Sequence, residues 1–373
     1  MAGIKFLGRV SLFLLPLIIF LGFPVFVLYE AKELMPDDQI ALREASSTSP
    51  VTIGLGYSNP FAYVQLHAAI LEKPTVLILG SSRIEGIRED FFDPGTSVYV
   101  AGGVVQKISY FRHFLEKIPL DQSPKVLVIG LDQKFFDPNY DSLAPDNIDS
   151  LLTKPLGPTD VLMNWSLVYR DYAQRKFSLS DLLHADDSRI GMSAIVHGAG
   201  FRNDGSYDPG PAIYTPPGLD PTLSYIDRGI VGFEYSDNVS VGALKELDAL
   251  LNECHERNIH VVGFIPPFSP VVYQKLMSMD DKYGYMNKLS ANINPLFDKY
   301  GFDFYNLADP GPLGITDKDM IDSLHVTERG SLIEFVKMAA ESNALQKYTD
   351  PKTLAETLAV STAETDLFKT GSK

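Results

Sequence analysis

The sequence predicts an α/β fold: a three-layer sandwich with a mostly parallel, five-stranded sheet, preceded by an N-terminal transmembrane helix. Short runs of Val, Ile and Leu recur without polar interruption, as in strands that are buried on both faces. Helical periods separate these runs, and such alternation is typical of parallel sheets covered by helices on both faces. A long apolar segment stands near the N-terminus.

The predicted strands are short apolar segments that end in glycine, proline or polar residues. They are the segments 75–80, 97–103, 125–132, 258–267 and 302–309. One helical face follows the second strand and consists of Ile108, Phe111, Phe114, Leu115 and Ile118. Another precedes the fourth strand and consists of Leu244, Leu247, Leu251 and Cys254. This order of elements predicts a mostly parallel sheet with helices on both faces.

Residues 10–29 are apolar, with Lys5 and Arg9 before them and acidic residues after them. Twenty helical residues at ~1.5 Å each span ~30 Å, which is one hydrocarbon core. The basic flank predicts a cytoplasmic N-terminus and a domain outside the cytoplasm. A cleaved signal peptide is the alternative, but the run is long and no A-x-A site follows it. We therefore expect a single-pass protein of the inner membrane with a periplasmic domain.

The sequence divides into an anchor and one large domain. We expect the anchor over residues 1–30, a juxtamembrane connector over 31–73, the α/β domain over 74–342, and a polar, frayed tail over 343–373. An insertion at about 136–240 is rich in Pro, Gly, Asp and Tyr, and we place it near the active edge of the sheet.

The composition excludes several classes of function. The chain has 373 residues, of which 45% are hydrophobic, so a sizeable core is available. Its net charge of −15 argues against a nucleic-acid partner, because phosphates would be repelled. Cys254 is the only cysteine, which excludes an intrachain disulfide and a cysteine-based metal site. The histidines are scattered, and no phosphate-binding glycine motif is present, so we expect no metal and no cofactor.

Two segments carry residues suited to nucleophilic catalysis. "TVLILGSSRIEGI" (75–87) ends the first strand of the sheet in Gly80-Ser81-Ser82, where the serines either cap the next turn or supply a nucleophile. In "IDSLHVTERG" (321–330), Asp322 and His325 are three residues apart and can lie on one side of a turn. A serine nucleophile needs an imidazole base, and that base needs a group that orients it. Ser82, His325 and Asp322 are the candidate catalytic residues.

This arrangement resembles the SGNH (GDSL-like) hydrolase superfamily over about residues 74–135 and 258–342. "GSSR" stands where that family has Gly-Asp-Ser, and "DSLH" matches its terminal Asp-x-x-His. The resemblance implies that Ser82 is the nucleophile and that Gly102 or Gly103 helps form the oxyanion hole. With its anchor, the chain is most similar to the membrane-anchored group that includes the D-alanyl transfer protein of teichoic acid modification and polysaccharide O-acetyltransferases.

The chain departs from the family pattern in the third motif, Gly-x-Asn-Asp, whose Asn donates to the oxyanion. "GLDQ" (130–133) places Asp132 at that position, and a carboxylate there repels an oxyanion unless it is protonated or turned away. Gln133 is the candidate replacement donor. The loss of one such donor can cost roughly 10²–10³ in rate.

Four residues are candidates for substrate binding: Arg83, Asp132, His197 and Arg202. Arg202 lies with Asp204 in the glycine-rich "GAGFRNDGSYD" (198–208), where an arginine can bind a carboxylate or phosphate. A structural ion pair is the alternative for Arg202. For Arg83, which follows Ser82, a structural role is the alternative as well.

The sequence thus predicts a serine-dependent ester hydrolase or O-acyltransferase. Its partners would be a carbohydrate polymer or acylated substrate and, for transfer, a membrane protein that donates the acyl group. A non-catalytic scaffold of a polysaccharide synthesis or export complex is the alternative, and Asp132 favours it. A cytoplasm-facing domain of unrelated function is a third hypothesis.

Overall fold

A computed structural model gives the structure of the protein over residues 2–47, 49–143, 146–211, 214–361 and 367–368. Within these residues, five parallel strands form the main sheet in the order β3-β2-β4-β8-β9. Their bounds are Val76–Leu79 for β2, Val98–Ala101 for β3, Val126–Gly130 for β4, His260–Ile265 for β8 and Asp303–Asn306 for β9. All five predicted strands are confirmed, and so is the α/β class.

Successive side chains of the central strands point alternately into two hydrophobic cores, one on each face of the sheet. Leu77 and Leu79 of β2 pack into a core with α3 (Phe61–Glu72), α4 (Ser109–Lys117), α12 (Val241–Glu256) and α14 (Asp280–Tyr300). Val76 and Ile78 pack into the other core with α15 (Glu328–Glu341) and α16 (Pro351–Val360). Every residue of β2, β3 and β4 is buried, which explains their continuous apolar sequences.

The order of the strands places the carboxyl end of β2 at the topological switch point of the sheet. β2 pairs with β3 on one side and with β4 on the other. The chain therefore adds β3 on one side of β2 and then adds β4 on the other side, so the direction of strand addition reverses at β2. Ligands of open α/β sheets bind at such a switch point, outside the carboxyl ends of the strands.

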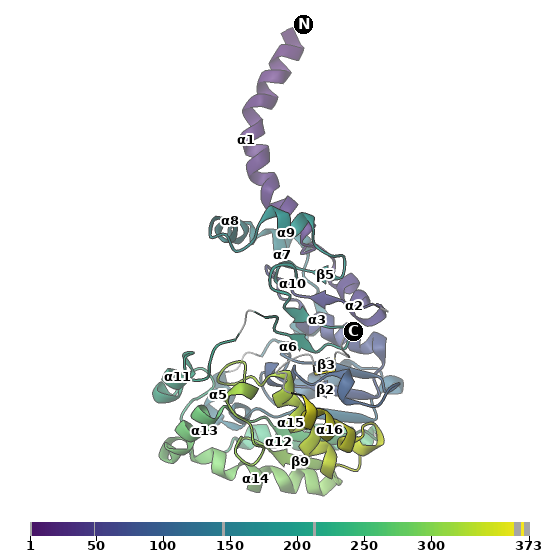
Figure 1. The fold of residues 1–373 in the computed structure, drawn as a ribbon, viewed down its shortest axis with the longest axis vertical. Coiled ribbons are helices and arrows are strands. Elements are labelled where there is room, and N and C mark those ends of the chain that lie inside the picture. Colours follow the sequence, from purple (N-terminus) through teal and green to yellow (C-terminus); the bar gives the residue numbers. More distant parts are fainter. Residues whose placement is uncertain (1, 48, 144–145, 212–213, 362–366, 369–373) are drawn as a thin grey trace.

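A helical layer joins the sheet domain to the N-terminal helix α1 (Ala2–Glu30) (Figure 1). It consists of α7 (Pro158–Leu162), α8 (Trp165–Ala173) and α9 (Leu179–Leu183), which contact the C-terminal half of α1. Val27 and Leu28 of α1 have no exposed surface in this layer. Residues 13–30 of α1 are long and apolar enough to cross a membrane, as either an anchor or a signal sequence would be.

Among the described residues, a second sheet of short strands has the order β5-β1-β6-β7. Its strands are β1 (Thr52–Ile53), β5 (Arg189–Ile190), β6 (Gly200–Phe201) and β7 (Tyr207–Asp208). The remaining helices are α2 (Asp37–Ser46), α5 (Pro138–Leu143), α6 (Ile148–Thr153), α10 (Met192–His197), α11 (Thr222–Arg228) and α13 (Pro270–Met277). The 3₁₀ turns are η1 (Ser82–Ile84), η2 (Glu89–Phe91), η3 (Leu120–Gln122), η4 (Gln133–Phe136), η5 (Asp317–Asp319) and η6 (Leu345–Lys347).

Two segments are more ordered than the sequence predicted. The connector over residues 31–73 contains α2 and α3, and α3 packs against the sheet. The segment after residue 342, expected to fray, forms η6 and α16, because Leu345 and Leu354 are buried in the core beside α15. A few apolar residues in a polar sequence are enough to dock such a segment once a core surface is available.

Candidate active site

The predicted nucleophile, Ser82, lies on a tight turn at the carboxyl end of β2. The strand ends at Leu79, and η1 begins at Ser82. Ser81 caps this turn, because its Oγ accepts the backbone N–H of Arg83 at 3.2 Å. Ser81 is buried, whereas Ser82 is exposed. Ser81 therefore caps the turn, and the hydroxyl of Ser82 does not take part in that capping.

Ser82, His325 and Asp322 form one chain of hydrogen bonds. The Oγ of Ser82 lies 2.9 Å from Nε2 of His325. On the other side of the ring, Nδ1 lies 2.8 Å from Oδ2 and 3.0 Å from Oδ1 of Asp322. The structure thus brings together the three predicted catalytic residues.

Asp322 also holds the loop that carries the histidine. Its Oδ1 accepts the backbone N–H groups of Leu324 and His325 at 2.7 and 2.8 Å. Burial pushes the pKa of Asp322 upward, but the hydrogen bonds from the His325 ring and from these N–H groups outweigh burial and keep that pKa below its ordinary value. An ionised Asp322 accepts Nδ1–H of a neutral imidazole, which leaves Nε2 as the acceptor for the serine proton.

A cavity of about 210 Å³ lies over Ser82 and His325. Its walls come from the loop after β2, from the β6–β7 hairpin, and from the segment 321–328 that leads into α15. Arg83, Arg88 and Arg202 bring positive charge to this wall, and all three have carboxylate partners. Arg88 lies 2.9 Å from Glu328, and Arg202 lies 2.8 Å from Asp208.

The predicted oxyanion glycines follow β3, next to the end of β2. Gly103 has a φ of +77°, which favours glycine. Within the described residues, the backbone N–H groups of Ser82, Gly102 and Gly103 donate to no protein acceptor, so they are available to a ligand oxygen. A methyl group on Gly102 would come within 2.2 Å of Glu85 Cγ, and one on Gly103 within 2.8 Å of Glu85 Oε1. Neither glycine lines the cavity, whereas Glu85, which lies against both, does.

Asp132 and Gln133 face Arg83 and do not line the cavity. Asp132 Oδ1 lies 3.7 Å from Nη1 of Arg83, and its Oδ2 lies 3.5 Å from Nζ of Lys134. Gln133 Oε1 accepts a hydrogen bond from the same Nη1 at 3.2 Å. The carboxylate of Asp132 is therefore paired with cations, and the predicted donor Gln133 is engaged by the arginine.

Arg83 is enclosed by protein groups, with 6% of its surface exposed. Its Nη2 donates to the carbonyls of Pro266 and Pro267 at 2.8 and 2.6 Å, and its Nε donates to that of Leu324 at 3.2 Å. The guanidinium also lies 4.5 Å from the ring centroid of Phe268. These contacts tie the nucleophile loop to the end of β8 and to the histidine loop, and they favour the structural interpretation of Arg83.

The structure separates the two other predicted binding residues. Arg202 lines the cavity and forms its ion pair with Asp208 there. The neighbouring Asp204 is buried, and its Oδ2 accepts the backbone N–H of Glu89 at 2.9 Å. His197, at the end of α10, is exposed and does not line the cavity.

The sequence-based predictions missed several polar residues of the cavity: Glu85, Arg88, Tyr207, Asp208 and Glu328. Glu85 follows Ser82 by three residues on a 3₁₀ turn, where side chains at i and i+3 eclipse, and this spacing was the available signal. No sequence pattern indicated Tyr207, because it reaches the cavity only when the β6–β7 hairpin has formed. The backbone N–H of Tyr207 donates to the carbonyl of Glu85 at 3.0 Å.

The site contains the parts that nucleophilic acyl chemistry requires: a free hydroxyl, a base within hydrogen-bond distance, and a carboxylate that orients the base. In the part of the chain that the structure describes, no group of three or more His, Cys, Asp or Glu side chains could hold a metal ion. No protein-family model and no curated protein sequence matches this chain. The interpretation of the site therefore depends on its geometry.

Proposed function

We propose that the chain is a serine-dependent ester hydrolase or O-acyltransferase that acts on acyl esters of an envelope or exported polysaccharide. The hydrogen-bonded chain of Ser82, His325 and Asp322 beside a cavity carries this proposal. Ser82 attacks the acyl carbon, and His325 takes its proton and passes it to the leaving alcohol. Water or a sugar hydroxyl then attacks the acyl-enzyme. His325 accepts the proton of that second nucleophile and returns it to Ser82 Oγ as the bond from this oxygen to the acyl carbon breaks. Asp322 keeps the imidazole in the required tautomer.

The charge of the cavity supports an uncharged sugar ester rather than a polyanion as the substrate. The three arginines of the wall, Arg83, Arg88 and Arg202, are each paired with a carboxylate, so none of them offers an unpaired positive charge to a substrate. A second hollow of about 580 Å³ shares Arg88, Arg202 and Asp208 with the first. This neighbouring space has room for sugar units that flank the reacting one, as a polymer substrate requires.

The order of the elements supports membership of the SGNH superfamily. The candidate nucleophile follows the central strand β2, the glycine pair follows β3, and Asp322 and His325 precede α15. The departure at Asp132 remains, but its carboxylate is paired with Arg83 and lies outside the cavity lining. A repulsive charge at the oxyanion position is therefore no obstacle to acyl chemistry at this site.

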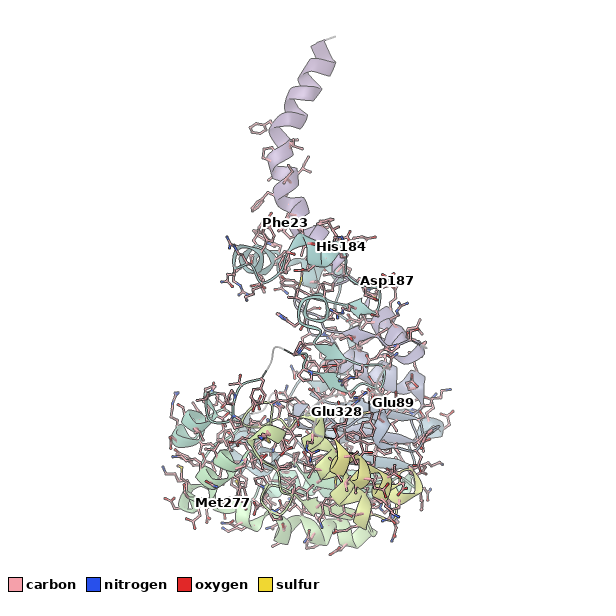
Figure 2. All side chains as sticks on the ribbon, viewed as in Figure 1. Phe23, Glu89, His184, Asp187, Met277 and Glu328 are labelled. Atoms are coloured by element: carbon pink, nitrogen blue, oxygen red, sulfur yellow. The ribbon has the colours of Figure 1, made fainter. Side chains whose placement is uncertain are left out.

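The packing of α1 supports a retained membrane anchor rather than a cleaved signal peptide. Val27, Leu28 and Ala31 have no exposed surface, and the carbonyl of Ala31 accepts the backbone N–H of Gly191 at 2.8 Å. Figure 2 shows Phe23 at the junction between α1 and the helical layer. Cleavage after the apolar run would remove core residues of that layer. The basic residues before the run favour a domain outside the cytoplasm.

A non-catalytic scaffold is the second candidate, and one observation favours it. Neither Asp132 nor Gln133 lines the cavity, so the third motif brings no side-chain donor to an oxyanion there. The complete hydrogen-bonded chain at Ser82 opposes this alternative, because a scaffold has no use for an oriented base.

The two candidates are separated by treating the full-length protein in detergent with a serine-directed phosphonate and a chromogenic acetyl ester. Full-length protein is required because residues 27–31 belong to the fold. We expect labelling of the wild type on Ser82, located by peptide mass spectrometry, and its loss in Ser82→Ala and His325→Ala. A wild type that neither labels nor turns over the ester would contradict the catalytic proposal and favour the scaffold.

A further inference from the structure

Glu85 follows Ser82 by three residues, lines the cavity and lies against the two predicted oxyanion glycines. The backbone N–H of Glu85 donates to the carbonyl of Ser82 at 3.4 Å, which continues the 3₁₀ turn and directs both side chains to the same side. The side chain of Glu85 lies against both glycines: a Cβ on Gly102 would collide with its Cγ, and one on Gly103 with its Oε1. The glycine pair thus makes room for this side chain beside the predicted oxyanion site.

The carboxyl of Glu85 forms no hydrogen bond or ion pair with the described residues, although it lines the cavity. Burial raises the pKa of Glu85 to about 7, and the proximity of His325 lowers it only in part. Charged and titratable groups from three segments share the cavity with it: Arg83 and Arg88 from its own loop, Arg202, Tyr207 and Asp208 from the hairpin, and Asp322, His325 and Glu328 from the segment 321–328.

We propose that Glu85 is a further catalytic residue, whose protonated carboxyl donates a hydrogen bond to the substrate carbonyl oxygen as that oxygen gains charge. The inference rests on the proposed acyl chemistry of Ser82. As the bond from Ser82 Oγ to the acyl carbon forms, the π electrons of the carbonyl move onto its oxygen. The O–H of Glu85 and the backbone N–H of Ser82, both from residues that line the cavity, stabilise that charge. The proton stays on Glu85 throughout.

The same role explains why the third motif is dispensable here. The family places an Asn donor at the position of Asp132, which in this chain is occupied by a residue paired with Arg83. A carboxylic acid that stays neutral near pH 7 can replace an amide as donor, as in known oxyanion holes built on a protonated carboxyl group. Once ionised, Glu85 would repel the oxyanion, so turnover must fall as Glu85 loses its proton.

The test compares four forms of the full-length protein in detergent between pH 5.5 and 9, with kcat for the acetyl ester and phosphonate labelling as readouts. The forms are wild type, Glu85→Gln, Glu85→Ala and the control Glu356→Gln, whose side chain is exposed on α16 and lines neither the cavity nor the neighbouring hollow. We expect the wild-type kcat to fall with a midpoint near pH 7. Glu85→Gln keeps a donor, so it should retain the rate at low pH and lose this alkaline fall. Glu85→Ala should lower kcat about 10²–10³-fold.

Each other outcome overturns the inference in a distinct way. If Glu85→Gln is as slow as Glu85→Ala, the ionised form is required and the donor role is wrong. If Glu85→Gln retains the alkaline fall, another group titrates. A labelled, active wild type with unaffected Glu85→Ala removes Glu85 from the mechanism and leaves Ser82 in place. An unlabelled, inactive wild type overturns both proposals together.

Discussion

Ser82 Oγ and His325 Nε2 lie 2.9 Å apart, although 243 residues separate them in the chain. The parallel sheet makes this possible, because it brings the carboxyl ends of strands that are distant in sequence to one edge. Arg83 then joins the two loops directly, since its Nε donates to the carbonyl of Leu324 beside the histidine. The geometry of the site therefore depends on the sheet and on one buried cation.

Asp322→Asn should lower the turnover of the acetyl ester about 10⁴-fold, because the amide no longer selects the Nδ1–H tautomer of His325. The measurement is kcat for the full-length protein in detergent, with circular dichroism to check the fold. Asp317→Asn, an exposed acid on η5, is the matched control and should retain the wild-type rate. Wild-type turnover in Asp322→Asn would exclude Asp322 from the mechanism.

Arg83→Met should destabilise the protein by about 3–5 kcal/mol, because it leaves the buried carboxylate of Asp132 without this cation. Three backbone carbonyls would lose their donor as well. The measurement is the free energy of unfolding in urea. Arg228→Met changes an exposed arginine of α11 and should stay within about 0.5 kcal/mol of the wild type. Equal effects of the two substitutions would refute the structural role of Arg83.

Glu44 should make the protein less stable as the pH rises. Burial raises the pKa of Glu44 from 4.5 to about 8, although the hydroxyl of Tyr99 donates to it at 2.9 Å. The folded protein therefore holds this proton more tightly than the unfolded chain. The stabilisation is complete below about pH 4 and is lost as the pH rises toward 8.

Glu44→Gln should remove this dependence on pH. The wild type should lose free energy of unfolding between pH 5 and pH 8, on the order of a few kcal/mol, and the variant should not. Urea unfolding at the two pH values measures the change. Glu356→Gln, on the exposed side of α16, should leave the wild-type dependence on pH intact. An unchanged dependence in Glu44→Gln would show that the carboxyl is ionised in the folded protein.

Leu28→Ala should destabilise the domain by about 2–5 kcal/mol, because Leu28 is fully buried against the helical layer. Leu17→Ala, at a position of α1 that is 51% exposed, should leave the stability of the domain unchanged. Unfolding of the purified full-length protein gives both values. A domain that is indifferent to Leu28→Ala would favour a cleaved signal sequence over an anchor.

Most of the sheet and the candidate triad could be predicted because their signals are local. Strands buried on both faces give continuous apolar runs, and Asp322 and His325 occupy neighbouring positions of one turn. The helices α2 and α16 could not be predicted in this way. Their sequences are polar, and they are stabilised by a few residues, such as Ile40 and Leu354, that find a partner surface only in the folded domain.

The sequence by itself determined the class of fold, the order of its strands along the chain, and the residue types available for catalysis. It did so because hydrophobic period and turn chemistry act over a few neighbouring residues. Only the tertiary structure decided which of these residues meet. It directed Arg83 and Asp132 toward each other, left His197 outside the cavity, and brought Glu85 onto Gly102 and Gly103. Such contacts depend on side-chain direction across distant segments, and no local pattern in the sequence encodes that direction.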